Sequence, residues 1–264
     1  MISIDKYAYM SKLKSKDPIQ KIIFAILTLG VCLWANSPAI SLAVLFIMGW
    51  VTVVKGGIPF LFFIKLMLVP MSFLVIGVLS VAFNVSTEPE AFLASVPLAG
   101  VWIGVSKAGL HQAVLLFFKA LGAVSCLYYL SLGTPMIDLL AALRRLKVPR
   151  IMVELMGLVY RFIFVLLETA ETIFTAQNSR LGYASLSAGF RSLGGLVSSL
   201  FIRAYKRSDE LYTALEARGY DGELNVLEEY HERHWTGYIP PLAANAFLIA
   251  AALLLRRFAG GPAG

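Results

Sequence analysis

The chain has 264 residues, of which 58% are hydrophobic and only 15% are charged, and its mean hydropathy is +0.75. Soluble domains are close to half apolar and a quarter charged, so this composition excludes a water-soluble globule, a disordered chain and a disulfide-rich secreted scaffold. Cys32 and Cys126 both lie inside apolar runs, which favours buried packing residues over a disulfide framework. The net charge of +7 is typical of lysine and arginine flanking membrane spans, and no nucleic-acid partner is expected. The sequence predicts an all-α, polytopic membrane protein.

Five membrane spans are predicted along the chain. An uncharged run at 22–54 is too long for a single span, and Asn36-Ser37-Pro38 supplies a break near its middle. We expect spans at about 19–35, 39–54, 58–83, 110–131 and 238–256. Pro70 predicts a kink in the third span. After this span we expect a loop with a short interfacial segment near 97–102.

The distribution of positive charge predicts a cytoplasmic N-terminus. Five lysines precede the first span or lie at its start, namely Lys6, Lys12, Lys14, Lys16 and Lys21. The loop at 84–106 carries no lysine or arginine, which suits the opposite side. Five spans would place Arg256 and Arg257 outside, against this rule, so a sixth crossing stays open.

Residues 135–237 differ in composition from the rest, with 12 of the 23 basic residues and 12 of the 16 acidic residues. Short amphipathic and long helices are expected at 135–146, 151–180 and 187–217. Polar positions at helical spacing form one stripe on the first long helix, namely Glu154, Gly157, Arg161, Glu168, Glu171 and Thr175. Such a helix either lies at the membrane surface or is a sixth span whose charges face a bundle. We therefore expect a membrane domain at 1–134, a cytoplasmic or interfacial domain of amphipathic helices at 135–237, and a final span with its tail at 238–264.

Both long helices are expected to end in similar motifs, Ser179-Arg180-Leu181-Gly182-Tyr183 and Ala217-Arg218-Gly219-Tyr220. In each motif an arginine lies where the helix dipole favours a cation, and a glycine suits a helix C-cap. Two capped helices would explain either motif alone. Their recurrence 38 positions apart favours a shared partner, because a guanidinium offers five donors in a rigid fork.

On these motifs the chain resembles the transmembrane T component of energy-coupling factor transporters, in its cobalt-type CbiQ branch. The two arginine motifs of that family correspond to Ser179-Arg180-Leu181 and Ala217-Arg218-Gly219, and the opening at residues 4–9 is also similar. The first motif departs from the usual Ala-Arg-small pattern, with serine before the arginine and leucine after it. The resemblance implies about five spans in a bacterial or archaeal cell membrane, with cytoplasmic coupling helices in the segment 135–237.

The resemblance also implies partners for a subunit that is itself no enzyme and holds neither a cofactor nor a metal. Each arginine motif would dock on one of two CbiO-like ATP-binding cassette ATPases. A CbiM-like S component, usually with a small CbiN-like subunit, would bind the transported ion, cobalt before nickel. The chain contains no Gly-x-x-x-x-Gly-Lys-Ser/Thr loop, in keeping with ATP hydrolysis on another subunit. A T component for nickel or a vitamin, and a secondary transporter, are the alternatives.

Other residues leave further interpretations open. Lys119 lies well inside the fourth predicted span, and a charged residue inside the membrane generally indicates a functional site. Three interpretations stay open: contact with a partner subunit, a polar contact within the chain, and snorkelling of the side chain to the membrane surface. His231 and His234 lie three positions apart beside three glutamates, which is a metal-site spacing, although a charged loop is the commoner explanation. A secondary transporter would need broken helices or repeats near mid-membrane, and only Lys65, Pro70 and Lys119 point that way.

Overall fold

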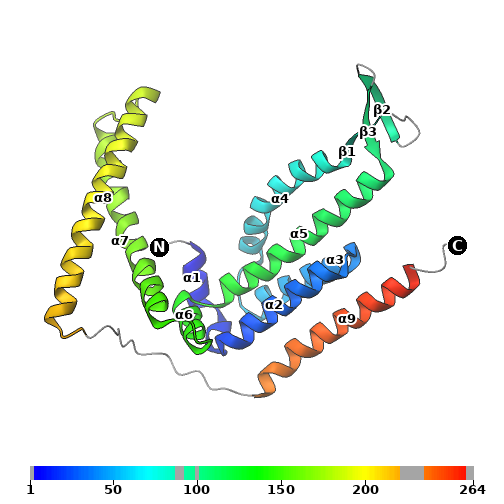
Figure 1. Ribbon diagram of the computed structural model, residues 1–264, viewed down its shortest axis with the longest axis horizontal. Coiled ribbons are helices and arrows are strands. Elements are labelled where there is room, and N and C mark those ends of the chain that lie inside the picture. The colour runs from blue at the N-terminus through cyan, green and yellow to red at the C-terminus, as the bar shows by residue number, and fades with distance from the viewer. Residues whose placement is uncertain (1–2, 87–91, 99–100, 221–234, 260–264) are drawn as a thin grey trace. The chain divides into compact units, whose positions relative to one another are not determined.

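The computed structural model describes residues 3–86, 92–98, 101–220 and 235–259, and in this part of the chain helices dominate (Figure 1). The helices and helical turns are α1 (Ser3–Met10), a 3₁₀ turn (Lys12–Ser15), α2 (Pro18–Ala35), α3 (Pro38–Trp50), a π-helical turn (Val51–Lys55), α4 (Phe60–Ala82), α5 (Lys107–Gly133), α6 (Met136–Arg145), α7 (Arg150–Ser179), α8 (Leu186–Ala217), a 3₁₀ turn (Trp235–Tyr238) and α9 (Ile239–Ala259). The strands are β1 (Phe83–Ser86), β2 (Phe92–Leu98) and β3 (Val101–Ser106). The predicted all-α membrane class is confirmed, with a small sheet in addition.

The described residues form two compact units. The first, here called the membrane unit, contains residues 3–136 and 235–259. The second, here called the hairpin unit, contains residues 137–220 and is built from α6, α7 and α8.

Four helical segments of the membrane unit are long and apolar enough to cross a membrane, and they are Pro18–Ala35, Pro38–Lys55, Phe60–Ala82 and Gly109–Gly133. They match the first four expected spans. Asn36 ends α2 in the left-handed conformation with φ of 48°, and Pro38 starts α3 at a position where its missing N–H costs nothing. The apolar stretch of α9 is shorter, Ile239–Leu255, so the fifth crossing stays a prediction. Among the described helices, α7 and α8 do not meet the same measure of length and hydropathy.

The core of the membrane unit lies where α5 packs against α2 and α3. Cys32 of α2 and Cys126 of α5 are both buried in it, as expected of packing residues. A methyl group on Gly122 of α5 would lie 2.9 Å from the Cys32 sulfur and 3.0 Å from the Ser41 carbonyl oxygen. The three helices therefore approach one another so closely at this point that glycine is the residue that fits.

Lys21 fastens the N-terminal segment to the membrane unit. Its side chain is buried, and its Nζ donates to the carbonyl oxygens of Leu13 (3.1 Å) and Gly133 (3.0 Å). Gly133 is the last residue of α5, where helix carbonyls lack partners inside the helix and the dipole favours a cation. In addition, the Ser11 hydroxyl donates to the Gly56 carbonyl (3.1 Å).

Between α4 and α5, β3 pairs antiparallel with both β1 and β2 (Figure 1). The expected loop after the third span contains this small sheet, in which Pro97 of β2 pairs with Trp102 of β3, and the interfacial position of 97–102 stays a prediction. The sequence of β3 is typical of a strand. Val101, Ile103 and Val105 alternate with other residues, which is the period of a strand, and β-branched residues favour it.

The hairpin unit confirms the three amphipathic helices expected between 135 and 217. In it, α7 and α8 run antiparallel and in contact with each other (Figure 1). The Ser185 hydroxyl caps α8 by accepting from the Ala188 N–H (3.2 Å). No residue of α8 is buried in the described structure. An apolar-rich helix with so much exposed surface is typical of an element that binds lipid or protein.

Candidate functional site

The two predicted arginine motifs end α7 and α8 with the same backbone geometry. Arg180 is the C-cap of α7 and Arg218 the C-cap of α8, with φ and ψ of −98° and 18° and of −95° and 7°. Two residues beyond each C-cap arginine, a backbone N–H returns to a carbonyl of the last helical turn, from Gly182 to Gln177 (2.9 Å) and from Tyr220 to Leu215 (3.0 Å). These bonds define a Schellman motif, so the two arginines occupy equivalent positions.

The residue after each arginine is left-handed, but the two ends differ in its identity. Gly219 has φ of 75°, as glycine readily does, whereas Leu181 has φ of 57°. The expectation that glycine supplies the C-cap conformation is therefore right for α8 and wrong for α7. Leu181 is 75% exposed, so packing within the hairpin unit does not explain why an apolar side chain occupies this strained position.

Gly182 has a packing role instead of a conformational one. A methyl group there would lie 2.7 Å from the Ser192 hydroxyl and 2.8 Å from the Gln177 carbonyl oxygen. The Ser192 hydroxyl donates to the Gly182 carbonyl (2.8 Å), and the Gln177 amide donates to the Ser192 carbonyl (2.9 Å). The Tyr183 hydroxyl donates to the Gln177 side-chain oxygen (2.8 Å). This α7–α8 clasp, made of Gln177, Gly182, Tyr183 and Ser192, holds the turn that presents Arg180.

The clasp was not predicted from the sequence, although Gly182 and Tyr183 were noted. The clasp joins Gln177, near the end of α7, to Ser192, near the start of α8. Both are ordinary polar residues on amphipathic helices, so neither stands out in the sequence. The ring of Phe174 adds an apolar contact, with its centroid 4.8 Å from that of Tyr183. Only Gly182 could have indicated the clasp from the sequence, because glycine often occurs where another part of the chain approaches the backbone closely.

Both arginines are exposed, as are Ser179 and Ala217 before them. The hydrogen bonds of the two caps are made by backbone groups, so the guanidinium groups are not needed to form them. At the second end, the Glu216 carboxylate accepts a hydrogen bond from Tyr212 and raises the pKa of that phenol. The ends present a guanidinium beside an apolar or small residue, which suits a partner surface with carboxylate or carbonyl groups.

The length of α8 keeps the two ends apart. A helix rises 1.5 Å per residue, so the 32 residues of α8 span about 48 Å. Arg180 precedes this helix and Arg218 follows it, and the antiparallel hairpin does not bring them together (Figure 1). A single small partner cannot bind both arginines at once, whereas two copies of one partner can each bind one.

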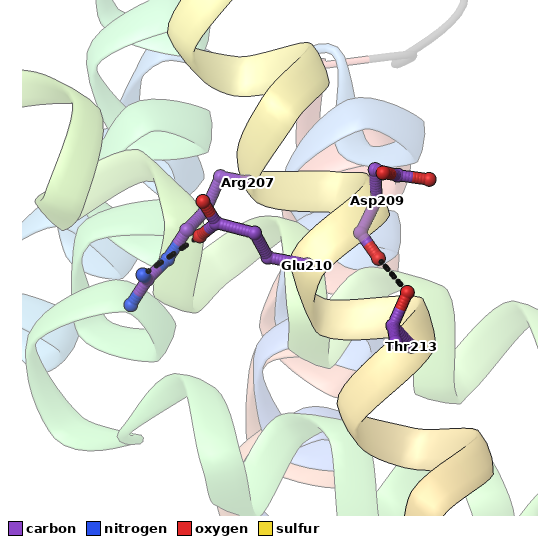
Figure 2. A network of polar contacts seen from close by, with 4 residues as sticks. All are labelled: Arg207, Asp209, Glu210 and Thr213. Carbon is purple, nitrogen blue, oxygen red and sulfur yellow. Dashed lines mark hydrogen bonds and ion pairs between the residues drawn. The ribbon is translucent and has the colours of Figure 1, made fainter.

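A shallow groove of about 250 Å³ lies between α7 and α8 away from the clasp. Arg161, from the predicted polar stripe, lines it together with Arg207 and Glu210 of α8. Figure 2 shows Arg207 and Glu210 on one side of α8, joined by an ion pair of 3.4 Å, while Asp209 points to the other side. The pair is largely exposed and contributes little to stability. Glu154, at the other end of the stripe, is buried.

Lys119 makes a polar contact inside the membrane unit. Its Nζ donates to the Asn36 side-chain oxygen (2.7 Å), in the turn between α2 and α3. The antiparallel register of α2 and α5 explains this pairing. Lys21 of α2 lies opposite Gly133 of α5. About 22 Å further along the two helices, the same register brings Asn36 opposite Lys119. The ammonium thus reaches a helix end, while a role against a partner subunit stays a prediction.

No group of three or more histidine, cysteine, aspartate or glutamate side chains that could hold a metal ion occurs among the described residues. His231 and His234, the pair with metal-site spacing, lie outside them.

Comparison with known proteins places this arrangement in a family. A family model described as cobalt transport protein, CbiQ, matches residues 10–229. The Salmonella typhimurium cobalt transport protein CbiQ is 36% identical over 160 residues, which cover 61% of this chain and 71% of that protein. The energy-coupling factor transporter transmembrane protein EcfT of Bacillus selenitireducens is 33% identical over 64% of this chain and 65% of its own length.

A third relative is named as a putative fusion protein. The putative fused cobalt transport protein CbiMQ of Methanocorpusculum labreanum is 25% identical over 95% of this chain, which covers 41% of that longer protein. With its spans and helix ends, the chain is a multi-pass membrane component of the energy-coupling factor class, the T component. It belongs to the CbiQ family of cobalt transport proteins, which confirms the family expected from the arginine motifs.

Proposed function

We propose that this chain couples ATP hydrolysis on two partner ATPases to the uptake of cobalt, which a separate S component binds. The observation that carries the proposal is the pair of equivalent helix ends. Arg180 and Arg218 have the same cap geometry, are both exposed, and lie at opposite ends of a helix about 48 Å long. Two identical or similar ATPase subunits, each with one groove for an arginine, match this spacing and number.

The coupling step follows from the mechanics of the hairpin unit. If the two ATPases approach each other on binding ATP, each carries one docked helix end with it. The clasp of Gln177, Gly182, Tyr183 and Ser192 makes the α7–α8 turn stiff, so displacement of one end is passed along the helices. The exposed apolar surface of α8 then transmits that displacement to an S component or to lipid.

Cobalt is proposed as the transported ion from the names of the family and of its relatives. The name of one relative, a putative CbiMQ fusion, supports a CbiM-like S component beside this chain. A small CbiN-like subunit is a further proposed partner. The metal ligands belong on the S component in this proposal. His231→Ala with His234→Ala should then leave uptake unchanged. Nickel or a vitamin as the substrate would keep the same coupling role.

The proposed orientation places the N-terminus and the hairpin unit in the cytoplasm. The lysines of the first 21 residues support it, because positive residues accumulate on the cytoplasmic side. The hairpin unit must be on the same side for its arginines to reach ATPases that use cytoplasmic ATP.

Co-purification followed by native mass spectrometry tests the proposal. The chain is co-expressed with candidate ATPase and CbiM-like partners, and the mass of the purified complex is measured. We expect one copy of this chain with two ATPase subunits and an S component, and ATP-dependent cobalt uptake after reconstitution. Cobalt uptake by the chain alone in liposomes, driven by an ion gradient without ATPases, would instead make it a secondary transporter.

A further inference from the structure

A cavity of about 920 Å³ lies in the membrane unit, at the end where α2 and α9 begin and where α5 and the π-helical turn after α3 end. Its described lining comes from all four of these elements. Neither the coupling role nor the arginine motifs use this cavity, because it is built from residues of the membrane unit alone.

The cavity has a basic part and an apolar part. Lys16, Lys21 and Lys55 line the basic part, and Asp17 is the one acidic residue among the described lining residues. Asp17 is engaged as the N-cap of α2, where its Oδ1 accepts from the Ile19 N–H (3.0 Å). The lining therefore has an excess of two positive charges.

Two of the three lysines are exposed and can therefore contact a ligand from outside. Lys21 is buried and donates to two carbonyls, whereas Lys16 and Lys55 are exposed. The Lys55 ammonium lies 5.5 Å from the centre of the Trp50 ring, which also lines the cavity. Most of the remaining lining is apolar and includes Phe24, which is buried, Ile47, which is half-buried, and Phe247, which is exposed.

These two parts match one class of ligand. A soluble anion would satisfy the lysines and leave the apolar wall against water, and a neutral lipid would leave two positive charges uncompensated. A molecule with a phosphate and acyl chains satisfies both, and basic pockets between helices at one membrane face are known to hold such headgroups. We propose that this cavity binds an anionic phospholipid, with the phosphate at Lys16 and Lys55 and an acyl chain along Phe24, Ile47 and Phe247.

The test uses the full chain purified in detergent. Phosphatidylglycerol, phosphatidylcholine and inorganic phosphate are each added, and lipid retention is measured by native mass spectrometry with thermal unfolding in parallel. We expect retention and a rise in Tm with phosphatidylglycerol only. Lys16→Gln with Lys55→Gln should weaken retention about thirty-fold, since each lysine near a lipid surface contributes roughly fivefold.

The matched control is Lys6→Gln with Lys12→Gln, which removes the same charge from two exposed lysines outside the cavity lining. This control should retain the lipid as the unaltered chain does. Ala244→Trp, which fills the cavity without a change of charge, should also abolish retention. Equal losses in the control and in the cavity variant, or stabilisation by inorganic phosphate alone, would overturn the proposal.

Discussion

Leu181 combines a left-handed backbone with an exposed apolar side chain. A left-handed backbone costs a residue with a branched side chain about 1 kcal/mol, and glycine does not have this cost. Leu181 has φ of 57°, and its backbone N–H donates to the Asn178 carbonyl (3.0 Å), but its side chain is 75% exposed and gains little from packing in the hairpin unit. We infer that the side chain packs into the partner groove that receives Arg180.

Replacement of this residue should separate stability from docking. Leu181→Gly should raise the free energy of unfolding by about 1 kcal/mol, because it removes the strain, and should weaken ATPase capture. Gly219→Ala is the matched control, since a methyl group there meets no atom within 4 Å and φ is 75°, and it should lose about 1 kcal/mol. Thermal unfolding and pull-down measure the two effects. Full ATPase capture by Leu181→Gly would show that the side chain has no role in docking.

Lys21 is the second residue with a large predicted effect. Its buried ammonium donates to the carbonyls of Leu13 and Gly133, and bonds from a charged donor contribute about 1.5–3 kcal/mol each. Lys21→Met should therefore lower the free energy of unfolding by roughly 3 kcal/mol or more, as measured by denaturation in detergent. Lys6→Met, on an exposed side chain of the same segment, should stay within about 0.5 kcal/mol. Equal effects of the two changes would mean that the Lys21 bonds do not hold the segment.

At the scale of elements, the α7–α8 clasp is the feature that gives the first helix end its rigidity. Gly182→Ala would press a methyl group against the Ser192 hydroxyl and the Gln177 carbonyl, so it should cost about 1–3 kcal/mol. Gly194→Ala, on the same α8 but with no atom within 4 Å of the new methyl, should instead gain about 0.5–1 kcal/mol. Hydrogen exchange of residues 177–192 reports both. Unchanged protection in Gly182→Ala would contradict the role of the clasp.

The helices of this protein could be predicted from its sequence because their signals are local. Run length and hydropathy locate the first four spans, and Asn36 and Pro38 mark the turn that divides a long run. The sheet between α4 and α5 could not be predicted in this way. Its strands are short, and their pairing joins segments that carry no turn signal strong enough to fix the register.

The two arginines of the candidate site could be predicted from the sequence, but the backbone geometry around them could not. Arg180 and Arg218 are found from a repeated motif, whereas the choice of Leu181 over Gly182 for the left-handed position depends on the contact of Gly182 with Ser192. The bond from Lys119 to Asn36 likewise depends on the register between α2 and α5. Both outcomes are set by tertiary packing, which a local pattern does not contain.

At the scale of the whole molecule, the orientation in the membrane has a direct test. Cysteine replacements at Lys12 and Arg218 should be protected from an impermeant reagent added to intact cells, and His111→Cys, at the exposed start of α5, should be labelled. The two native cysteines are buried, so their background should be low. Labelling of Arg218→Cys from outside would contradict the cytoplasmic placement of the hairpin unit.

The central claim is that two helix ends each anchor one ATPase. Losing one arginine leaves the other anchor in place, so Arg180→Ala or Arg218→Ala should impair cobalt uptake while part of the complex survives. Losing both removes two anchors of about 2 kcal/mol each, which together weaken association by about three orders of magnitude if they add. Arginines that only stabilise helix ends would contribute about 0.3–1 kcal/mol of local stability each and would leave the complex intact.

The most direct measurement is therefore ATPase pull-down with the two single variants and the double variant, with cobalt uptake measured on the same preparations. Arg203→Ala, an exposed arginine within α8 and away from both helix ends, is the matched control and should behave as the unaltered chain. We predict stepwise loss, with no ATPase retained by Arg180→Ala with Arg218→Ala. A double variant that still holds its ATPases, hydrolyses ATP and takes up cobalt would contradict the account and place the coupling on other residues.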